Sequence, residues 1–498
     1  MKMWRRVVVV GTLLVGCAGG SQETRPSPSD PDTGEGTPHP SQGTVELLKS
    51  FVPPNPKAPE DSALGYPDPL VAGGNKLYFA VTYRSGDLCC GLWMSDATPQ
   101  GTVPLKTFDP KVDKNYVVRE LAPVGDRIFF VAGNATATDG AELWVSDGTQ
   151  SGAHLLKAVT PGQGKKPTDT PNHGLVALGK SLLFFQVYPS TSTAPGHTEL
   201  WKSDGTPAGT VRVKDLGTNS TVDPGLVAGN TFYFASSDPG HGAELWKSDG
   251  TESGTQLVQD IAPGADGSNP SDFQTDGTSL YFTASVNSHK SLWKSDGGGA
   301  GIVYPLDQDT TEDTLAPLAL SGKTLFLSAV GKDNLLRLYG MTLGGSGPAQ
   351  RQLIATLPNA TAQAGYGKPR IADVAAGGGK LYFSQYLPYR QAPSDLQLWV
   401  TDGTPAGTRL LKSPMYLSDE YGTNMAVVGG RVLTASSSQD TGIEPWVSDG
   451  TVEGTQEVKD LSEGSSVPRL FTTVGNAIFF VAYDLQHGHS LWVFKPNS

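Results

Sequence analysis

Short, continuously apolar runs recur along the chain, mostly about 45 to 60 residues apart. Clear examples are KLYFAV (76–81), RIFFVA (127–132), LLFFQV (182–187) and TFYFAS (231–236). A strand with one solvent-exposed face alternates apolar and polar residues. Because these runs are apolar at successive positions, they predict strands that are covered on both faces. A Gly-Asn, Gly-Asp or Gly-Lys pair stands just before each run, which favours a two-residue hairpin with positive φ.

Residues 224–261 display the whole repeating unit. PGLVAG predicts a first strand, TFYFAS a second, ELWKSD a third and TQLVQDI a fourth, with short turns between them. Four consecutive strands joined in this way form a meander blade. Stacking each blade between two neighbours covers both faces of the second strand, so the pattern predicts an all-β fold, a single β-propeller of four-stranded blades.

The third strand and the turn after it carry the most regular motif. It reads ELWKSDGTESGT at 244–255 and returns as ELWKSDGTPAGT at 199–210 and EPWVSDGTVEGT at 444–455. Looser copies bring the count to nine units, one of which has Tyr339 in the tryptophan place. Burial of an indole between blades favours folding strongly, so we interpret the repeated tryptophans as packing residues. They are Trp93, Trp144, Trp201, Trp246, Trp293, Trp399, Trp446 and Trp492.

The Ser-Asp-Gly-Thr that follows the tryptophan predicts a tight turn. Its hydroxyls and carboxylate are suited to bonding nearby N–H groups, and its glycine to a strained backbone position. Metal binding is the alternative role for the aspartates of this turn, and the structural role is preferred. These aspartates are Asp147, Asp204, Asp249, Asp402 and Asp449.

The two ends of the repeat array are complementary. The last unit stops after its third strand, at SLWVF (490–494), whereas GTVELLKSF (43–51) matches the fourth-strand pattern of other units. The N-terminal strand is therefore predicted to complete the last blade, which removes the exposed edges of an open array. The count is nine blades, and an eight-bladed ring with the 315–355 unit distorted is the alternative.

The composition agrees with this architecture, and the net charge disfavours one class of binding partner. The chain has 61 glycines and 37 prolines, high counts that are typical of turn-rich β proteins. The net charge of −12 repels phosphate backbones, so nucleic acid is not an expected partner.

The first residues predict export and lipid anchoring. A basic start, MKMWRR, precedes a short apolar stretch, and Leu14-Val15-Gly16-Cys17 resembles the bacterial lipobox, whose cysteine is lipidated after cleavage. Ordinary secretory cleavage nearby is the alternative. The predicted organisation is a signal peptide (1–16), lipidated Cys17 with a flexible tether (17–42) and the propeller (43–498). Because Ala18 replaces the aspartate that favours inner-membrane retention in such lipoproteins, the outer membrane or cell surface is the expected location.

Candidate ligand residues lie in the loops. Five histidines fall in loops between second and third strands and are expected on one rim: His197, His241, His289, His487 and His489. Of these, His487 and His489 are the only close pair, and a metal site there is the alternative to ordinary rim side chains. The segment 260–273, with Asp260, Asp266 and Asp272, has the composition of a calcium loop, although a solvated turn is preferred. No other cofactor is expected.

Two further observations concern chemistry. Cys89 and Cys90 are adjacent in the sequence. In an exported protein they could form a vicinal disulfide or remain two unreactive free thiols, and both alternatives stay open. Zinc-protease, nucleophile-elbow and phosphate-loop motifs are absent from the sequence.

Over residues 44–494 the chain resembles the bacterial ELWxxDGT-repeat proteins, a family of exported, propeller-like repeat proteins. The Asp-box of sialidase propellers is less similar, because here the tryptophan precedes the aspartate. We expect a monomeric binding or scaffold module for protein or glycan partners, held at the membrane by its lipid. The alternative is an extracytoplasmic carbohydrate-active hydrolase or lyase with its site at the propeller axis.

The lipobox gives a first testable prediction. If Cys17 carries the lipid, Cys17→Ser removes the acyl chains, each buried methylene of which contributes roughly 0.8 kcal/mol to membrane binding. The variant should move from the membrane to the soluble fraction when cells are fractionated. Unchanged membrane partitioning would contradict the lipobox interpretation.

Overall fold

The computed structural model is built from β-strands alone over the residues that it describes. These are residues 42–497 except for 52–64, 84–89, 110–115, 135–141, 158–171, 189, 191, 193–194, 239, 308–311, 345–348, 360–366, 389–394, 416–424 and 439. The strands form nine four-stranded sheets, and neighbouring strands pair in antiparallel fashion. Each sheet corresponds to one predicted blade.

Blades 1 to 8 each take four strands that are consecutive in the chain. Blade 1 has β2 (Gly65–Gly73), β3 (Lys76–Tyr83), β4 (Gly91–Ser95) and β5 (Val103–Thr107). Blade 2 has β6 (Tyr116–Val124), β7 (Arg127–Asn134), β8 (Glu142–Ser146) and β9 (His154–Lys157). Blade 3 has β10 (Asn172–Leu178), β11 (Ser181–Tyr188), β12 (His197–Ser203) and β13 (Val211–Thr218). Blade 4 has β14 (Thr221–Ala228), β15 (Thr231–Asp238), β16 (Gly242–Ser248) and β17 (Gln256–Gln259).

The second half of the chain repeats this arrangement. Blade 5 has β18 (Ser271–Thr275), β19 (Leu280–Val286), β20 (His289–Ser295) and β21 (Ala300–Pro305). Blade 6 has β22 (Ala316–Ser321), β23 (Thr324–Val330), β24 (Leu336–Thr342) and β25 (Arg351–Leu357). Blade 7 has β26 (Arg370–Gly377), β27 (Lys380–Leu387), β28 (Asp395–Thr401) and β29 (Arg409–Lys412). Blade 8 has β30 (Met425–Val428), β31 (Arg431–Ser438), β32 (Gly442–Ser448) and β33 (Gln456–Glu457).

Blade 9 joins the two ends of the chain. Its strands are β34 (Arg469–Val474), β35 (Ala477–Asp484), β36 (Gly488–Pro496) and β1 (Gly43–Ser50), in the order β1-β36-β35-β34. The register pairs Val45 with Phe494 and Leu47 with Trp492. Beyond the strands, the Asn497 N–H donates to the Gln42 carbonyl at 3.0 Å. The predicted closure by the N-terminal strand is confirmed.

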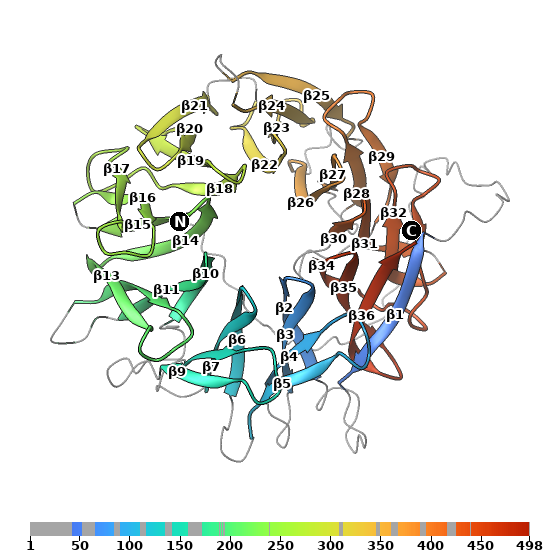
Figure 1. The fold of residues 1–498 in the computed structure, drawn as a ribbon. Coiled ribbons are helices and arrows are strands. Elements are labelled where there is room, and N and C mark those ends of the chain that lie inside the picture. The colour runs from blue at the N-terminus through green and yellow to red at the C-terminus, as the bar shows by residue number, and fades with distance from the viewer. Residues whose placement is uncertain are drawn as a thin grey trace. The chain divides into compact units, whose positions relative to one another are not determined.

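The nine blades close into a ring within the unit formed by residues 41–498. The first strand of each blade contacts the first strand of the next, from β2 through β6 and onward to β34, which contacts β2 again. Figure 1 shows these first strands innermost and the fourth strands outermost. The nine-bladed propeller is therefore confirmed, and the eight-bladed alternative is wrong because residues 316–357 form a regular four-stranded blade.

The hydrophobic core is divided among the junctions between blades. Each of nine clusters of buried side chains draws on two adjacent blades. The second strands supply most of them, as in β15, where Phe232, Tyr233 and Phe234 are at most 1% exposed. Stacking covers both faces of these strands, which is why their sequence is apolar at successive positions.

The short turn between first and second strands explains the glycine before each apolar run. Gly74 and Gly229 have φ values of 59° and 60°, a region that residues with a Cβ seldom adopt. A two-residue turn of this kind matches the twist of the paired strands.

The leader, Cys17 and most of the predicted tether lie outside the described residues. Within the described part of the chain, no helix is long and apolar enough to cross a membrane.

Candidate functional site

The repeat turn is a self-contained hydrogen-bond network, and blade 4 illustrates it. Oδ1 of Asp249 accepts from the Thr251 N–H at 2.9 Å and from the Thr251 hydroxyl at 2.7 Å. The hydroxyls of Ser248 and Thr255 meet at 2.7 Å, which ties the start of the turn to its end. A Cβ on Gly254 would lie 2.0 Å from the Asp249 carboxylate, so glycine is required there. Asp147, Asp204, Asp402 and Asp449 accept the same pair of bonds in their own turns.

The repeat tryptophans lie on third strands, and six of the eight stack on a phenylalanine of the second strand, whereas Trp446 pairs with Thr434. Trp93 stacks on Phe79 with centroids 6.3 Å apart, and Trp399 stacks on Phe383 at 6.4 Å. Most of them also join the cluster between their own blade and the preceding one: Trp93, Trp144, Trp201, Trp246, Trp293, Trp399 and Trp492. Trp446 lies under the Lys412 ammonium, 3.9 Å from the ring centroid. These side chains are built into the packing between blades.

The glutamate two residues before the tryptophan has two different roles. In blades 2 and 3 it accepts the indole N–H, as Glu199 does from Trp201 at 2.9 Å. In blades 4 and 8 it is fully buried and holds the loop to the next blade. Glu244 accepts from the Ala262 and Ser268 N–H groups and from the Ser268 hydroxyl. Burial raises the pKa of Glu444, the corresponding residue of blade 8, while bonds from Ser466 and Leu461 oppose the rise.

The five rim histidines are distributed over four blades, with His487 and His489 both on blade 9, and they contact separate partners. Nδ1 of His241 lies 2.9 Å from Asp238, and Nδ1 of His487 lies 3.0 Å from Asp484 in the same local arrangement. His289 lies 3.2 Å from Asp307.

His489, the sequence neighbour of His487, faces a cation. Its Nδ1 lies 3.3 Å from the Arg469 guanidinium, and its ring meets Tyr483 edge to face. His487 and His489 therefore have different partners, and among the described residues neither belongs to a group of three or more donors close enough for an ion.

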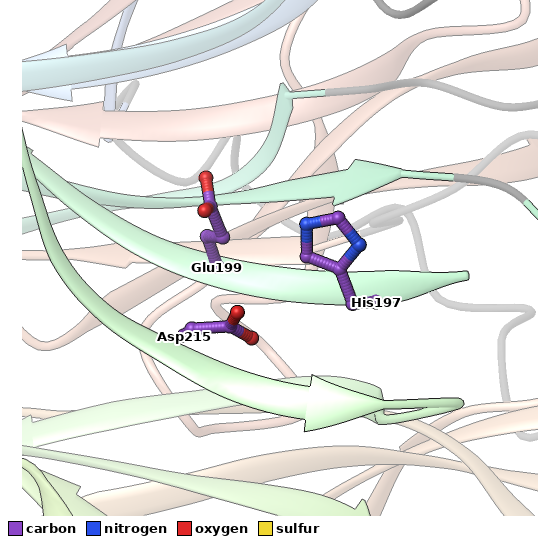
Figure 2. Close-up of side chains that lie close together, drawn as sticks. All are labelled: His197, Glu199 and Asp215. Atoms are coloured by element: carbon purple, nitrogen blue, oxygen red, sulfur yellow. The ribbon is translucent and has the colours of Figure 1, made fainter. Parts of the chain in front are cut away.

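His197 is the rim histidine that has further metal ligands beside it. The ligand atoms of His197, Glu199 and Asp215 all lie within 4.8 Å of one another. Figure 2 shows His197 and Glu199 on one strand and Asp215 on the adjacent strand. In the part of the chain that the structure describes, this is the one group of three or more such donors close enough for an ion.

The surroundings of this donor cluster hold its side chains in place. The Tyr188 ring stacks on the His197 imidazole at 4.4 Å and 7°. Oε1 of Glu199 accepts from the Arg212 guanidinium at 2.9 Å, and the carboxylate is 8% exposed. Burial, together with the negative charge of Glu199, raises the pKa of Tyr188.

The segment 260–273 does not bring together the aspartates of the calcium loop that was the alternative to a solvated turn. Asp272 lies on β18, where it accepts from the Thr283 hydroxyl at 2.7 Å and from the Lys290 ammonium at 3.0 Å. Asp260, Asp266 and Asp272 form no donor group in this segment, every residue of which is described. The loop is instead fixed by the buried Glu244, through its bonds to residues 262 and 268.

The innermost strands carry charged side chains that are anchored one by one. Glu120 accepts from the Leu175 N–H of the next blade at 3.4 Å, and burial raises the pKa of its carboxyl group. Asp272 is bound to Lys290, and Arg469, 5% exposed, lies beside His489. Each of these charges therefore has its own partner on the propeller.

A cavity of about 480 Å³ lies at the junction of blades 5 and 6, where the motif departs most from the repeat. Its lining includes Tyr281, Lys294, Ile302, Leu343 and Gln350. In blades 3 and 4 the lysine after the tryptophan donates to a carbonyl in the next blade's turn, from Lys202 to Gly250 and from Lys247 to Gly297.

Lys294 is the corresponding lysine of blade 5. Its ammonium lies 5.7 Å from the Tyr281 ring centroid and makes no hydrogen bond or ion pair within the described structure. Among the described residues, Lys294 therefore lacks the link to the next blade that Lys202 and Lys247 make.

Comparisons with known proteins do not assign the chain to a family. No family model matches the chain, and no curated protein sequence matches it. Among solved structures, the β-propeller domain of the Trilobed protease from Pyrococcus furiosus is 12% identical with a TM-score of 0.37, over 71% of this chain and 99% of that one. Oligopeptidase B from Leishmania major is 11% identical with a TM-score of 0.43, over 77% and 53%.

A structure from a study of two prolyl endopeptidases is 15% identical with a TM-score of 0.43, over 77% of this chain and 54% of that one. This chain spans about half the length of that protein and of oligopeptidase B. The fold assignment rests on the strand pairing of the chain itself.

Sequence reasoning missed Glu199 and Asp215 because both belong to the repeat. Glu199 is the first letter of ELW, and Asp215 lies in a fourth strand whose pattern recurs at 258–261 and 458–461. Only the strand register places Asp215 opposite Glu199. His197 and Glu199 are two residues apart on one strand. Aligning that strand with the next one, so that Asp215 faces Glu199, would have identified the cluster. Cys90 is buried. Cys89 lies outside the described residues, so the choice between a vicinal disulfide and two thiols stays a prediction.

The structural role of the repeat aspartates gives a prediction with a pH signature. Bonds from the Thr251 hydroxyl and N–H lower the pKa of Asp249. A folded-state pKa below the unfolded value of about 3.9 stabilises the protein above that pH, and the contribution is lost as pH falls through the folded-state pKa. Asp249→Ala should therefore reduce stability by about 1 kcal/mol at neutral pH, with the difference from wild type shrinking below about pH 4.

Thermal melts at several pH values measure this effect. Asp296→Ala is the matched control, because Asp296 occupies the same place in blade 5 and accepts a hydrogen bond from the Gly298 N–H at 3.0 Å, without a threonine hydroxyl in its turn. A smaller loss is expected there. A wild-type melting temperature that rises with millimolar calcium, and no such rise in Asp249→Ala, would favour metal binding instead.

Proposed function

We propose that this protein is an exported lipoprotein of the ELWxxDGT-repeat type whose propeller binds a protein partner at the cell envelope. The recurrence of the motif and the lipobox at Cys17 support the first part. The anchor at Cys17 would hold the monomeric propeller at a membrane surface, with the outer membrane or cell surface preferred. A glycan partner is the alternative within the same role.

The proposal rests on a difference between the repeated residues, which hold the scaffold together, and the residues that vary between blades. The repeated Trp, Asp, Thr and Ser side chains are engaged in stacking and turn networks in blade after blade. Residues engaged in this way hold the scaffold together, so recognition falls to positions where a blade departs from the repeat. Blade 6 departs furthest, and the cavity lies at its junction with blade 5.

The chemistry of this junction suits a protein segment. Ile302, on the outermost strand of blade 5, lines the cavity and is 60% exposed. An exposed large apolar side chain at the mouth of a pocket is a suitable anchor for a protein partner. The Lys294 ammonium adds a partner for a carboxylate, so the expected ligand segment presents an apolar side chain next to an acidic group.

A pair of matched variants tests this role. Ile302→Glu places a negative charge at the cavity mouth, and since Ile302 is exposed, the fold should be retained. Leu155→Glu is the control, because Leu155 also faces a repeat tryptophan across its strand pair and is 37% exposed on blade 2. Quantitative cross-linking in intact cells, followed by mass spectrometry, measures partner recovery, with a glycan array run on the same proteins.

The proposal predicts a protein partner that is recovered with wild type and Leu155→Glu and falls roughly tenfold or more with Ile302→Glu. Equal recovery with all three proteins would contradict the blade 5–6 site. Glycan binding that Ile302→Glu abolishes would keep the site and change the class of partner. Turnover of a carbohydrate substrate would replace the binding role with the enzymatic alternative.

A further inference from the structure

The strand register of blade 3 places three metal-ligating side chains on one face of its sheet. His197 and Glu199 are two residues apart on β12, so their side chains lie on the same face. Asp215 on β13 pairs directly with Glu199 across the strands, and directly opposed residues share a face. The resulting proximity of an imidazole and two carboxylates follows from rigid, paired strands and not from a loop.

The side chains around the cluster hold two of these donors in position. Tyr188 stacks flat on the imidazole of His197, which limits its rotation. Glu199 is oriented by the Trp201 indole N–H at 2.9 Å and by Arg212 at 2.9 Å. Hydrogen bonds from surrounding groups orient carboxylate ligands in metal sites and tune their basicity.

Arg212 opposes a bound cation but does not block one. Its guanidinium occupies one side of Oε1 of Glu199, and a carboxylate has about four lone-pair positions. The Arg212 side chain is 56% exposed, so it can move toward solvent when a second positive charge arrives. Asp215 is exposed, with Oδ1 accepting from the Gly217 N–H, and leaves an open side from which an ion can enter.

The cluster is specific to blade 3 and is not required by the repeat. In blades 4 and 8 the equivalent glutamates are fully enclosed by the loop that they hold. In blade 5, His289 stands at the place of His197, but Ser291 replaces the glutamate and Asp307 binds the histidine. Among the described residues no other blade brings three such donors together, so their coincidence on blade 3 needs a separate reason.

From this geometry we propose that His197, Glu199 and Asp215 bind a divalent transition-metal ion, with Zn²⁺ as the preferred ion. One imidazole nitrogen and two carboxylate oxygens are ligands that Zn²⁺ takes, and the intrinsic order of affinities places Zn²⁺ above Mn²⁺ and Fe²⁺. Three protein ligands leave at least one coordination position for water or for a group of a partner. The site lies on the rim of blade 3, on a different blade from the cavity, and does not depend on the binding role proposed above.

Metal titration of the full-length protein, after treatment with a chelator, tests the site. Isothermal calorimetry with Zn²⁺ and the visible absorption of added Co²⁺ report affinity and coordination. His197→Gln and Asp215→Asn each remove one ligand, and the exposed position of Asp215 makes its variant the safer one for folding. His289→Gln is the matched control, because it removes a rim histidine bound to an aspartate on another blade.

The site predicts one ion per chain in wild type and in His289→Gln. Binding should be weakened at least tenfold in His197→Gln and Asp215→Asn, with loss of the Co²⁺ absorption bands. Circular dichroism should show that both variants keep the wild-type fold. The proposal is overturned if wild type binds no ion, if both ligand variants bind like wild type, or if His289→Gln loses as much affinity as they do.

Discussion

The pairing of the first strand with the last is the interaction on which the propeller depends. Every core cluster lies between two blades, so no blade completes its own core. At the junction of the chain ends, β1 contributes to both neighbouring clusters. Val45 packs in the cluster shared with blade 8, whereas Leu48 and Phe51 pack in the cluster shared with blade 1. Without β1 two of the nine clusters lose apolar side chains, and the third strand of blade 9 becomes an exposed edge.

This division of the core also explains the distribution of function proposed here. Residues that recur in every blade are engaged by packing and by turn networks, and a change in them would act first on stability. Departures from the repeat cost the scaffold little where a neighbouring blade still covers the strand. The cavity beside blade 6 and the donor cluster on blade 3 are two such departures, and they lie on different blades.

The fold could be predicted from the sequence because each of its determinants is local and repeated. The apolar run, the Gly-Asn turn and the ELW strand each identify their element, and the missing fourth strand of the last unit identifies its partner at residues 43–51. The site could not be predicted in the same way. The link between Glu199 and Asp215 depends on cross-strand register, and the two roles of the motif glutamate depend on loops that differ between blades.

The histidines illustrate the same limit. Their position near the start of the third strands did not indicate what each ring would contact, because each ring's chemistry depends on its neighbour. Asp238 and Asp484 bind His241 and His487, whereas His489 meets an arginine. Among the described residues, His197 is the histidine that forms a donor group with two carboxylates, and neither carboxylate carries a distinguishing signal in the sequence.

The most direct test of the account is the melting temperature of a protein lacking residues 43–51, compared with one lacking residues 18–40. Loss of β1 removes its ladder and the burial of Val45, Leu48 and Phe51, worth roughly 5 kcal/mol in apolar burial alone, which is comparable with the whole stability of many domains. Deletion of 18–40 removes none of the contacts described. The account predicts a melting temperature near wild type for the second deletion and a markedly lower one for the first. Equal melting curves for the two proteins would mean that the ring does not depend on the pairing of its ends.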